Sequence, residues 1–153
     1  MLDDRTMRRA ECRLPGETEQ VSAARRFVTN LVGDGWLDIG DAALLTGELA
    51  NNAVLHSASG LPGGKFVVRV IVRPFRYLLV EVEDEGGPWL ETVGDDDERG
   101  RGLQIIRVLA NEWSRAGSAE TGWIVWARID WAESPKRVGR APGPAGPMIP
   151  AAL

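Results

Sequence analysis

Cysteine, histidine and long apolar runs are all scarce in this chain. The single cysteine, Cys12, excludes an intrachain disulfide, and we expect it to serve as a small buried apolar residue on a strand. With His56 as its only histidine, the chain cannot build a metal site on a histidine pair. No apolar run approaches the ~18 residues that span a membrane, and the residues after Met1 contain no apolar signal-peptide core. These absences predict a cytoplasmic protein.

A net positive charge is also lacking. Acidic residues outnumber basic residues by 22 to 18, so the formal net charge is −4. Binding to nucleic acid without sequence preference needs a basic face, and a polybasic membrane anchor needs a basic cluster. We therefore expect no direct contact with either. Hydrophobic residues make up 44% of the 153 positions, which is enough for the core of one domain.

Hydrophobic periodicity predicts the helices and strands. Spacings of three and four residues predict one helix after a cap at Thr18 and another over about residues 39–57 after a cap at Asp38. A third helix is predicted to start near Gly102. Alternating patterns predict strands, in chain order, at residues 7–14, 66–73, 77–84, 113–117 and 123–131. This order predicts an α+β two-layer sandwich, with helices on one face of a mixed, mostly antiparallel sheet.

One domain, residues 1–131, accounts for all of these elements. Within it, residues 86–100 lack periodicity and contain the acidic run 95–98, so we expect a mobile loop. Residues 132–153 are rich in Pro, Gly, Arg and Ala, a composition that predicts a disordered tail.

Three polar clusters carry chemistry. In the first, Glu48, Asn52 and His56 are four residues apart, so they share one stripe of a helix beside the apolar face. A carboxylate and a carboxamide at the edge of a core can hold a hydrated Mg²⁺, because this hard cation prefers oxygen ligands. Taken alone, the pattern is equally typical of the polar border of an ordinary helix.

The second cluster ends a predicted strand. Asp84 shares the parity of Leu78, Val80 and Val82, so it should face the core, where a carboxylate needs a hydrogen-bond donor such as the amino group of adenine. Gly86 would let a flat ring approach the backbone closely. An Asp in an ordinary strand-to-turn transition gives the same pattern.

The third cluster precedes the predicted third helix. Gly100 and Gly102 would expose free N–H groups at the start of that helix to an anion, and Arg99 and Arg101 could add charge-assisted contacts to phosphate. A flexible loop before a capped helix is the alternative. The three clusters together, in this order along one α+β chain, are far more specific than any one of them.

These clusters resemble the motifs of the GHKL ATPases. The segment Glu48-Leu-x-x-Asn52-Ala-x-x-His56 resembles their N box, Asp84-x-Gly86 their first Gly box, and Gly100-Arg-Gly102-Leu their second. The Gly-Arg-Gly-Leu segment, followed by Leu-Ala-x-x-Trp and then Val-Trp-Ala, is typical of the branch of stand-alone anti-sigma-factor serine kinases. The resemblance covers roughly residues 7–130.

The resemblance implies a role for each matching residue in binding ATP with Mg²⁺. Asn52 would be the Mg²⁺ ligand, Glu48 the general base, and Asp84 the acceptor for the adenine amino group. Gly86 would shape the adenine pocket. His56 would have a supporting role only. The phosphate contacts would come from the second Gly box, namely Gly100, Arg101, Gly102 and Leu103.

The sequence also departs from the family pattern. The first Gly box lacks the second, spaced glycine, since Gly87-Pro88 follow Gly86 directly. Relatives often have Gly-Lys-Thr or Gly-Thr-Thr where this chain has Gly122-Trp123-Ile124, so a hydroxyl that would support Asp84 through water is missing. The acidic run before Gly100 would repel phosphates unless the loop moves away or Mg²⁺ compensates.

The leading hypothesis from this resemblance is a regulatory serine/threonine protein kinase. It would act on a partner antagonist protein of the anti-anti-sigma type, hold a sigma factor, or both, and it could be a homodimer. A nucleotide-gated protein-binding switch without catalysis is the main alternative. The chain could also be a histidine-kinase catalytic domain separated from its dimerisation helices, although the helix carrying a phosphoacceptor histidine is missing. A degenerate GHKL fold that binds no nucleotide is the fourth possibility.

Overall fold

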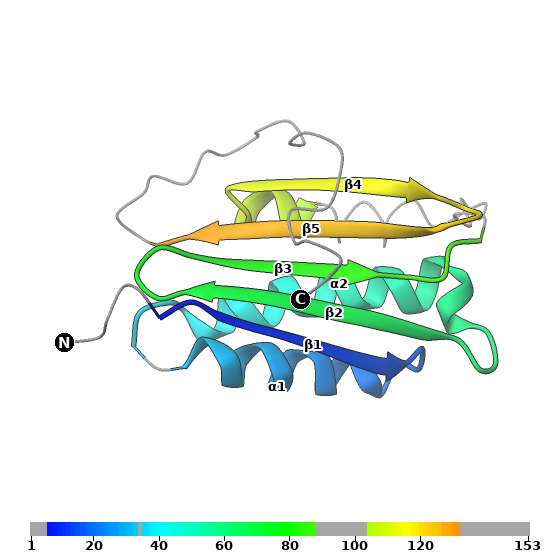
Figure 1. Ribbon diagram of the computed structural model, residues 1–153, viewed down its shortest axis with the longest axis horizontal. Coiled ribbons are helices and arrows are strands. Elements are labelled where there is room, and N and C mark those ends of the chain that lie inside the picture. The colour runs from blue at the N-terminus through cyan, green and yellow to red at the C-terminus, as the bar shows by residue number, and fades with distance from the viewer. Residues whose placement is uncertain (1–5, 34, 88–103, 132–153) are drawn as a thin grey trace.

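The computed structural model describes residues 6–33, 35–87 and 104–131. A five-stranded sheet carries helices on one face, and in the view of Figure 1 these helices lie behind the sheet. The elements are β1 (Arg8–Pro15), α1 (Gln20–Val32), α2 (Ile39–His56), the short 3₁₀ helix η1 (Ala58–Gly60), β2 (Lys65–Arg73), β3 (Tyr77–Glu83), β4 (Glu112–Ser118) and β5 (Gly122–Asp130). Residues 104–109 are also helical.

The sheet has the strand order β1-β2-β3-β5-β4. All four pairings between the described strands are antiparallel. The predicted α+β two-layer fold is confirmed. The predicted disordered tail and most of the predicted loop lie outside the described residues.

Helix ends show where the local prediction held and where it failed. The carboxylate of Asp38 caps α2 by accepting hydrogen bonds from the N–H groups of Gly40 and Asp41 at 2.8 and 3.3 Å, as predicted. The predicted cap at Thr18 is wrong. Glu19 occupies the cap position of α1, and its side chain makes no capping hydrogen bond. Backbone carbonyls of the preceding turn accept hydrogen bonds from the first N–H groups of the helix instead; for example, the N–H of Val21 donates to the carbonyl of Thr18.

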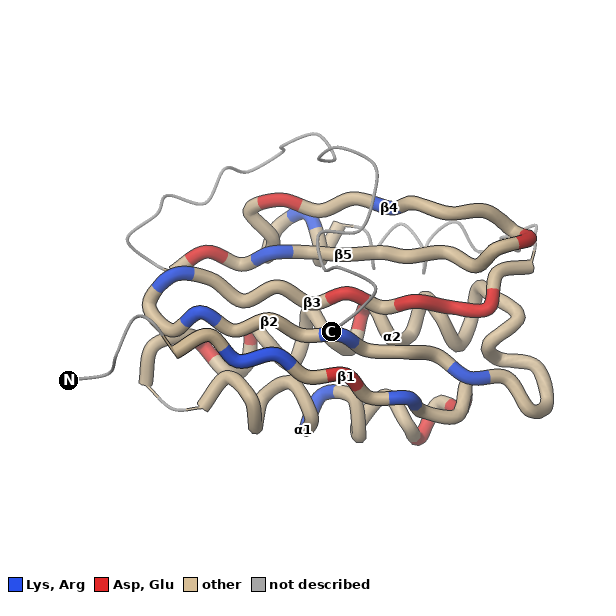
Figure 2. Tube along the Cα trace, viewed as in Figure 1, with Lys and Arg blue, Asp and Glu red and all other residues tan. Residues whose placement is uncertain are grey.

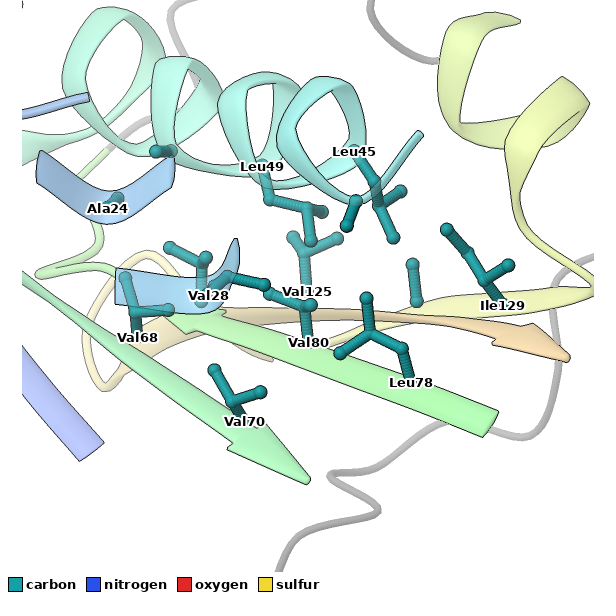
Figure 3. Packing of buried hydrophobic residues seen from close by; sticks show 14 of the residues in the cluster. Ala24, Val28, Leu45, Leu49, Val68, Val70, Leu78, Val80, Val125 and Ile129 are labelled. Carbon is teal, nitrogen blue, oxygen red and sulfur yellow. The ribbon is translucent and has the colours of Figure 1, made fainter. Parts of the chain in front are cut away.

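The hydrophobic core lies between the sheet and the two long helices (Figure 3). One side of each central strand packs against α1 and α2, through side chains that alternate along the chain as predicted: Val68, Val70, Leu78, Val80, Val125 and Ile129 from the sheet, and Ala24, Val28, Leu45 and Leu49 from the helices. Full burial of one such Val or Leu side chain contributes about 1.5–3 kcal/mol. This packing fixes the rotation of α2 and therefore the direction of its polar stripe.

The helical segment 104–109 and strand β1 lie at the border of this core. Ile106 and Leu109 of the helical segment 104–109, and Ala110 directly after it, are buried in the same core. Cys12 lies on β1 as predicted but is only half-buried, and partial burial raises the pKa of its thiol. No helix within the described segments is long and apolar enough to cross a membrane.

Candidate functional site

The predicted polar stripe of α2 lies at the border of the core. Leu45 and Leu49 are fully buried and place the adjacent stripe beside the sheet rather than in bulk water. Asn52 is buried, while Glu48 and His56, one turn before and one turn after it, are half-buried. The three side chains are therefore partly shielded from solvent, which is the environment predicted for them.

Asn52 is the most unusual residue of this stripe. Its side chain is 7% exposed, and its Nδ2 atom has no hydrogen-bond partner among the described residues. A buried amide donor without an acceptor costs about 1–3 kcal/mol, so most native proteins avoid one. A phosphate oxygen would satisfy this donor, and the amide oxygen of the same side chain could ligate Mg²⁺. The chemistry of Asn52 therefore fits a nucleotide phosphate with its metal ion.

Glu48 lies next to a cation from the neighbouring helix. A Cβ atom on Gly47 would come within 2.5 Å of Nε of Arg25, so the side chain of Arg25 crosses α2 where this glycine leaves room. Burial raises the pKa of Glu48, and the positive charge of Arg25 partly opposes this rise. A carboxylate with a raised pKa is a better proton acceptor than an ordinary one, provided that it is ionised.

Asp84 is held at the end of β3 by two backbone donors. Its Oδ1 atom accepts hydrogen bonds from the N–H of Gly86 at 2.7 Å and from the N–H of Trp123 at 3.0 Å. The side chain is buried and faces inward, as its parity with Val80 and Val82 predicted. Within the described part of the chain, no hydrogen bond reaches Oδ2. This second oxygen can therefore accept a hydrogen bond from a ligand such as the amino group of adenine.

Burial and neighbouring groups have opposite effects on the pKa of Asp84. Burial raises the pKa of Asp84 above its ordinary value, while the two N–H groups and the charge of Arg115 pull it down. The guanidinium of Arg115 lies 4.4 Å from the centre of the Trp123 ring, in a cation–π arrangement next to the carboxylate.

Gly86 and Gly87 lock the end of β3 between two other elements. The carbonyl of Gly86 accepts a hydrogen bond from the N–H of Ala58 in η1 at 2.7 Å, and the N–H of Gly87 donates to the carbonyl of Ala119 at 2.7 Å. Both glycines have positive φ, 78° and 82°. A Cβ on Gly86 would lie only 2.4 Å from the Ala119 oxygen. Packing against protein backbone therefore requires glycine at this position, whatever else it contacts.

These contacts bring the two described motifs to one end of the sheet. The C-terminal end of α2, the end of β3 and the β4–β5 turn meet there, at the right of Figure 1. Ser59 strengthens the junction, because its hydroxyl donates to the carbonyl of Lys65 at 2.6 Å and accepts from the N–H of Glu85 at 2.9 Å. Of the predicted site residues, Gly100, Arg101, Gly102 and Leu103 lie outside the described residues.

A separate apolar groove lies between α2 and the 104–109 helix. Its volume is about 340 Å³, and it is lined by Leu44, Gln104, Ile105, Val108 and Leu109. Leu44 and Val108 are exposed there. This groove contains neither Asn52 nor Asp84, and its apolar lining suits contact with a protein better than contact with phosphate.

Sequence reasoning missed several contributors to the site. Trp123 and Ala119 act through backbone atoms, so their side chains carry no signal of the role. Arg25 and Arg115 depend on which helices and strands lie side by side, which local patterns do not reveal. Gly47 was the only available hint of Arg25, since a glycine inside a helix often marks a close approach.

Comparison with known families identifies the arrangement. The model of one family, the histidine kinase-like ATPase domain, matches residues 14–129. This range extends from the end of β1 to the end of β5 and includes Glu48, Asn52, Asp84 and Gly86. The comparison with curated proteins found no match.

Proposed function

The chain belongs to the histidine kinase-like ATPase domain family, and from this premise we propose that it is a regulatory serine/threonine protein kinase of the anti-sigma-factor type. Membership implies that the domain binds ATP. Two observations carry the proposal: an unsatisfied buried amide on α2, Asn52, and an anchored carboxylate directly after β3, Asp84, on elements whose ends meet at one end of the sheet. The finer assignment, to transfer onto a serine of a partner antagonist, rests on the motif order and on Glu48.

Each residue would have a separate task in binding. Asp84 would accept a hydrogen bond from the adenine amino group on Oδ2, since its Oδ1 is already engaged by Gly86 and Trp123. Asn52 would ligate Mg²⁺ through its amide oxygen and donate from Nδ2 to a phosphate oxygen. When bound, ATP with Mg²⁺ supplies the phosphoryl group and neutralises its charge.

Glu48 would act on the incoming hydroxyl. Its carboxylate would orient a serine hydroxyl of the partner and take up the proton as the oxygen becomes phosphorylated. Partial burial supports this role, because the raised pKa of Glu48 makes its carboxylate more basic. The junction around Ser59 and Gly86 would fix the position of α2 relative to β3. Correct positioning of ATP and the serine hydroxyl would then supply most of the catalysis.

The first experiment is calorimetric titration of ATP into the wild type, with Mg²⁺ and with EDTA. We expect micromolar binding with Mg²⁺, at least ~10-fold weaker binding in Asp84→Asn, and loss of the Mg²⁺-dependent part in Asn52→Ala. Asn51→Ala is the matched control, because Asn51 lies on the same turn of α2 but points about 100° away. Absence of binding at millimolar ATP would rule out a kinase.

Transfer is then tested with ATP radiolabelled in its γ-phosphate and an extract of the native cells. The wild type should label a protein partner, and Glu48→Gln should bind ATP with unchanged affinity but label nothing. Equal labelling by wild type and Glu48→Gln would remove Glu48 from the mechanism.

A nucleotide-gated protein-binding switch is the second candidate. The apolar groove with exposed Leu44 and Val108 favours it, since such a surface suits a protein partner. Binding of ATP without any labelling in the same experiment would support the switch over the kinase.

A further inference from the structure

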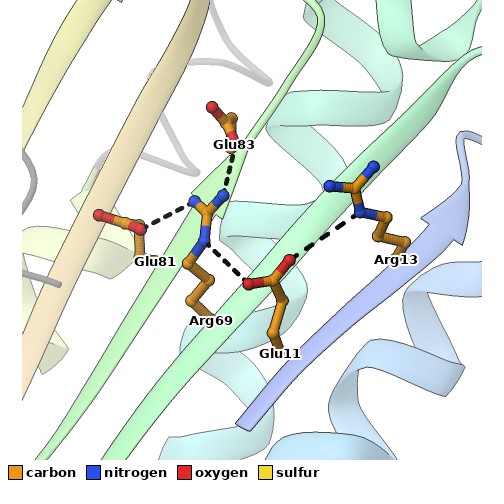
Figure 4. A network of polar contacts seen from close by, with 5 residues as sticks. All are labelled: Glu11, Arg13, Arg69, Glu81 and Glu83. Atoms are coloured by element: carbon orange, nitrogen blue, oxygen red, sulfur yellow. Dashed lines mark hydrogen bonds and ion pairs between the residues drawn. The ribbon is translucent and has the colours of Figure 1, made fainter. Parts of the chain in front are cut away.

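The two faces of the sheet hold their arginines in different ways. On the outer face, which is turned away from the helices, Arg69 pairs with three carboxylates at 3.5, 3.0 and 2.7 Å (Figure 4), those of Glu11, Glu81 and Glu83. On the inner face, which carries the helices, Arg115 lies opposite the core residue Val125. Its guanidinium is 4.4 Å from the centre of the Trp123 ring. An arginine and an aromatic ring therefore meet beside the candidate ATP site.

Trp123 is the first inward-facing residue of β5. Its side chain shares the parity of three buried core residues of the same strand, Val125, Ala127 and Ile129. Trp123 itself is only half-buried. The indole therefore lies at the edge of the core, at the end of the sheet where Asp84 is located.

Asp84 and Trp123 are neighbours across two strands. The register of β3 and β5 pairs Glu83 with Ile124. The N–H of Asp84 donates to the carbonyl of Trp123 at 2.9 Å, so the antiparallel register continues for one more pair. Side chains directly opposite each other in such a pair have Cβ atoms about 4.5–5.5 Å apart. Since both side chains face inward, the carboxylate and the indole border the same space.

Glycines stand beside this pair on both neighbouring strands. Gly117 is the partner of Trp123 on β4, and a Cβ added there would collide with the carbonyl of Gly122. Gly86 follows Asp84 by two residues, and a Cβ there would collide with the carbonyl of Ala119. Neither glycine places a side chain beside the indole, which suits the approach of a flat ligand.

Arg115 supports the ring and offsets the charge next to it. It lies two residues from Gly117 on β4, and therefore diagonally across from Trp123, where a guanidinium can cover an aromatic face. Figure 2 shows acidic positions gathered along the second half of β3 and directly after it. Burial raises the pKa of Asp84, whereas the charge of Arg115 lowers it, so this arginine favours the ionised acceptor.

A base held by Asp84 would lie against Trp123. The proposed function places the adenine amino group on Oδ2 of Asp84, because Oδ1 is engaged by the N–H groups of Gly86 and Trp123. A purine ring system is larger than the spacing between the two side chains, so it would extend over the indole. Aromatic side chains stack on bases, and every base presents a flat π-face for this contact.

We propose, on the premise of the proposed function, that the indole of Trp123 stacks on the adenine ring of bound ATP, with the guanidinium of Arg115 on the other side of the indole. The two inward-facing residues would then have separate tasks. Trp123 supplies affinity for a base without distinguishing one base from another, and Asp84 selects adenine through its amino group.

Calorimetric titration of the full chain with ATP and Mg²⁺ tests the contribution of the ring. Trp123→Leu keeps an apolar side chain on the strand but removes the aromatic face, and it should weaken ATP binding by about 5- to 150-fold. Trp123→Phe is the matched control, because it keeps an aromatic ring and should retain most of the affinity. Titration with tripolyphosphate, which has no base, should give the same result for both variants as for the wild type.

NMR of the indole N–H groups tests the contact directly, without any assay of activity. The signal of Trp123 is identified as the one missing from the spectrum of Trp123→Phe, and it should shift when ATP is added to the wild type. It should shift little with tripolyphosphate. Trp126 is the internal control, because it is fully buried with the outer-face cluster and its signal should move little with either ligand. This measurement does not need Trp123→Leu to fold.

The outcomes separate this inference from the proposed function. Unchanged ATP affinity in Trp123→Leu, or a Trp123 signal that ATP does not move, would overturn the stacking and leave the proposed function standing. Equal weakening of ATP binding in Trp123→Leu and Trp123→Phe would also overturn it, because the aromatic ring would then be unimportant. No binding of ATP by the wild type would overturn both.

Discussion

Asp84 and Trp123 hold each other through two hydrogen bonds. The N–H of Trp123 donates to Oδ1 of Asp84 at 3.0 Å, and the N–H of Asp84 donates to the carbonyl of Trp123 at 2.9 Å. This pair joins the end of β3 to the start of β5 and orients the carboxylate from the backbone. The backbone of Trp123 therefore supports Asp84, whereas the sequence predicted a lost support because the segment Gly122-Trp123-Ile124 lacks a hydroxyl side chain.

The raised pKa of Asp84 predicts how stability should depend on pH. Its pKa in the unfolded chain is the ordinary 3.8, and burial raises it in the folded protein. The stability contributed by the protonated form is complete below the unfolded pKa and is lost as pH rises through the folded value. The free energy of unfolding of the wild type should therefore fall relative to Asp84→Asn as pH rises over this window. Urea denaturation of both proteins at several pH values measures this difference, and a constant or increasing difference would contradict the expectation.

Gly86→Ala should lower the free energy of unfolding by more than the cost of placing alanine at a positive φ. A residue other than glycine in this conformation costs about 1–2 kcal/mol. At Gly86 the added Cβ would also meet the Ala119 oxygen at 2.4 Å, which adds a clash with backbone. Gly63→Ala is the matched control, because Gly63 has a similar φ of 80° and a Cβ added there would have no atom within 4 Å. Equal losses in free energy of unfolding for the two variants would show that the packing around Gly86 is unimportant.

Arg25→Ala should raise the pKa of Glu48 further. Arg25 is the charged group that opposes the effect of burial on this carboxyl, so its removal leaves the rise uncompensated. Arg26→Ala is the control, since Arg26 is exposed on the adjacent position of α1. An NMR titration of the Glu48 side-chain carbon measures the pKa in each protein without any assay of activity. A shift of the same size in both variants would contradict a specific role for Arg25.

Arg69→Met should be strongly destabilising. This substitution removes the guanidinium that, among the described residues, lies within hydrogen-bond distance of Glu81. Removal of one partner of a buried ion pair costs about 3–5 kcal/mol of stability. Addition of Glu81→Gln should restore part of the loss, because the uncompensated buried charge is then also removed.

Arg128→Met is the comparison for this variant. Arg128 pairs with Glu112 at 3.0 Å and Asp130 at 2.8 Å, but these side chains are more open to solvent than Glu81. Its replacement should cost only about 1 kcal/mol. Urea denaturation measures all three variants. A loss for Arg69→Met no larger than that for Arg128→Met would show that the outer-face carboxylates are well solvated.

Much of the fold could be predicted from local patterns. The alternation over residues 66–73 and 77–84 predicted the strands β2 and β3. The four-residue spacing of Glu48, Asn52 and His56 predicted that these side chains share one stripe of α2 at the border of the core. The cap at Thr18 failed because a preceding backbone turn satisfied the same donors. A local pattern identifies a residue that is able to cap a helix, but it cannot reveal which competing acceptor wins.

The sequence by itself determined which residue types recur at helical and strand spacing, and through them the helices, the strands, the inward parity of Asp84 and the polar stripe of α2. Only the tertiary structure decided that Trp123 would hold Asp84, that Arg25 would lie over Gly47, and that Arg69 would face three carboxylates. The physical reason is range. Periodicity arises from the geometry of one element, whereas these contacts depend on the register between strands and the packing between helices, which the burial of the whole core fixes together.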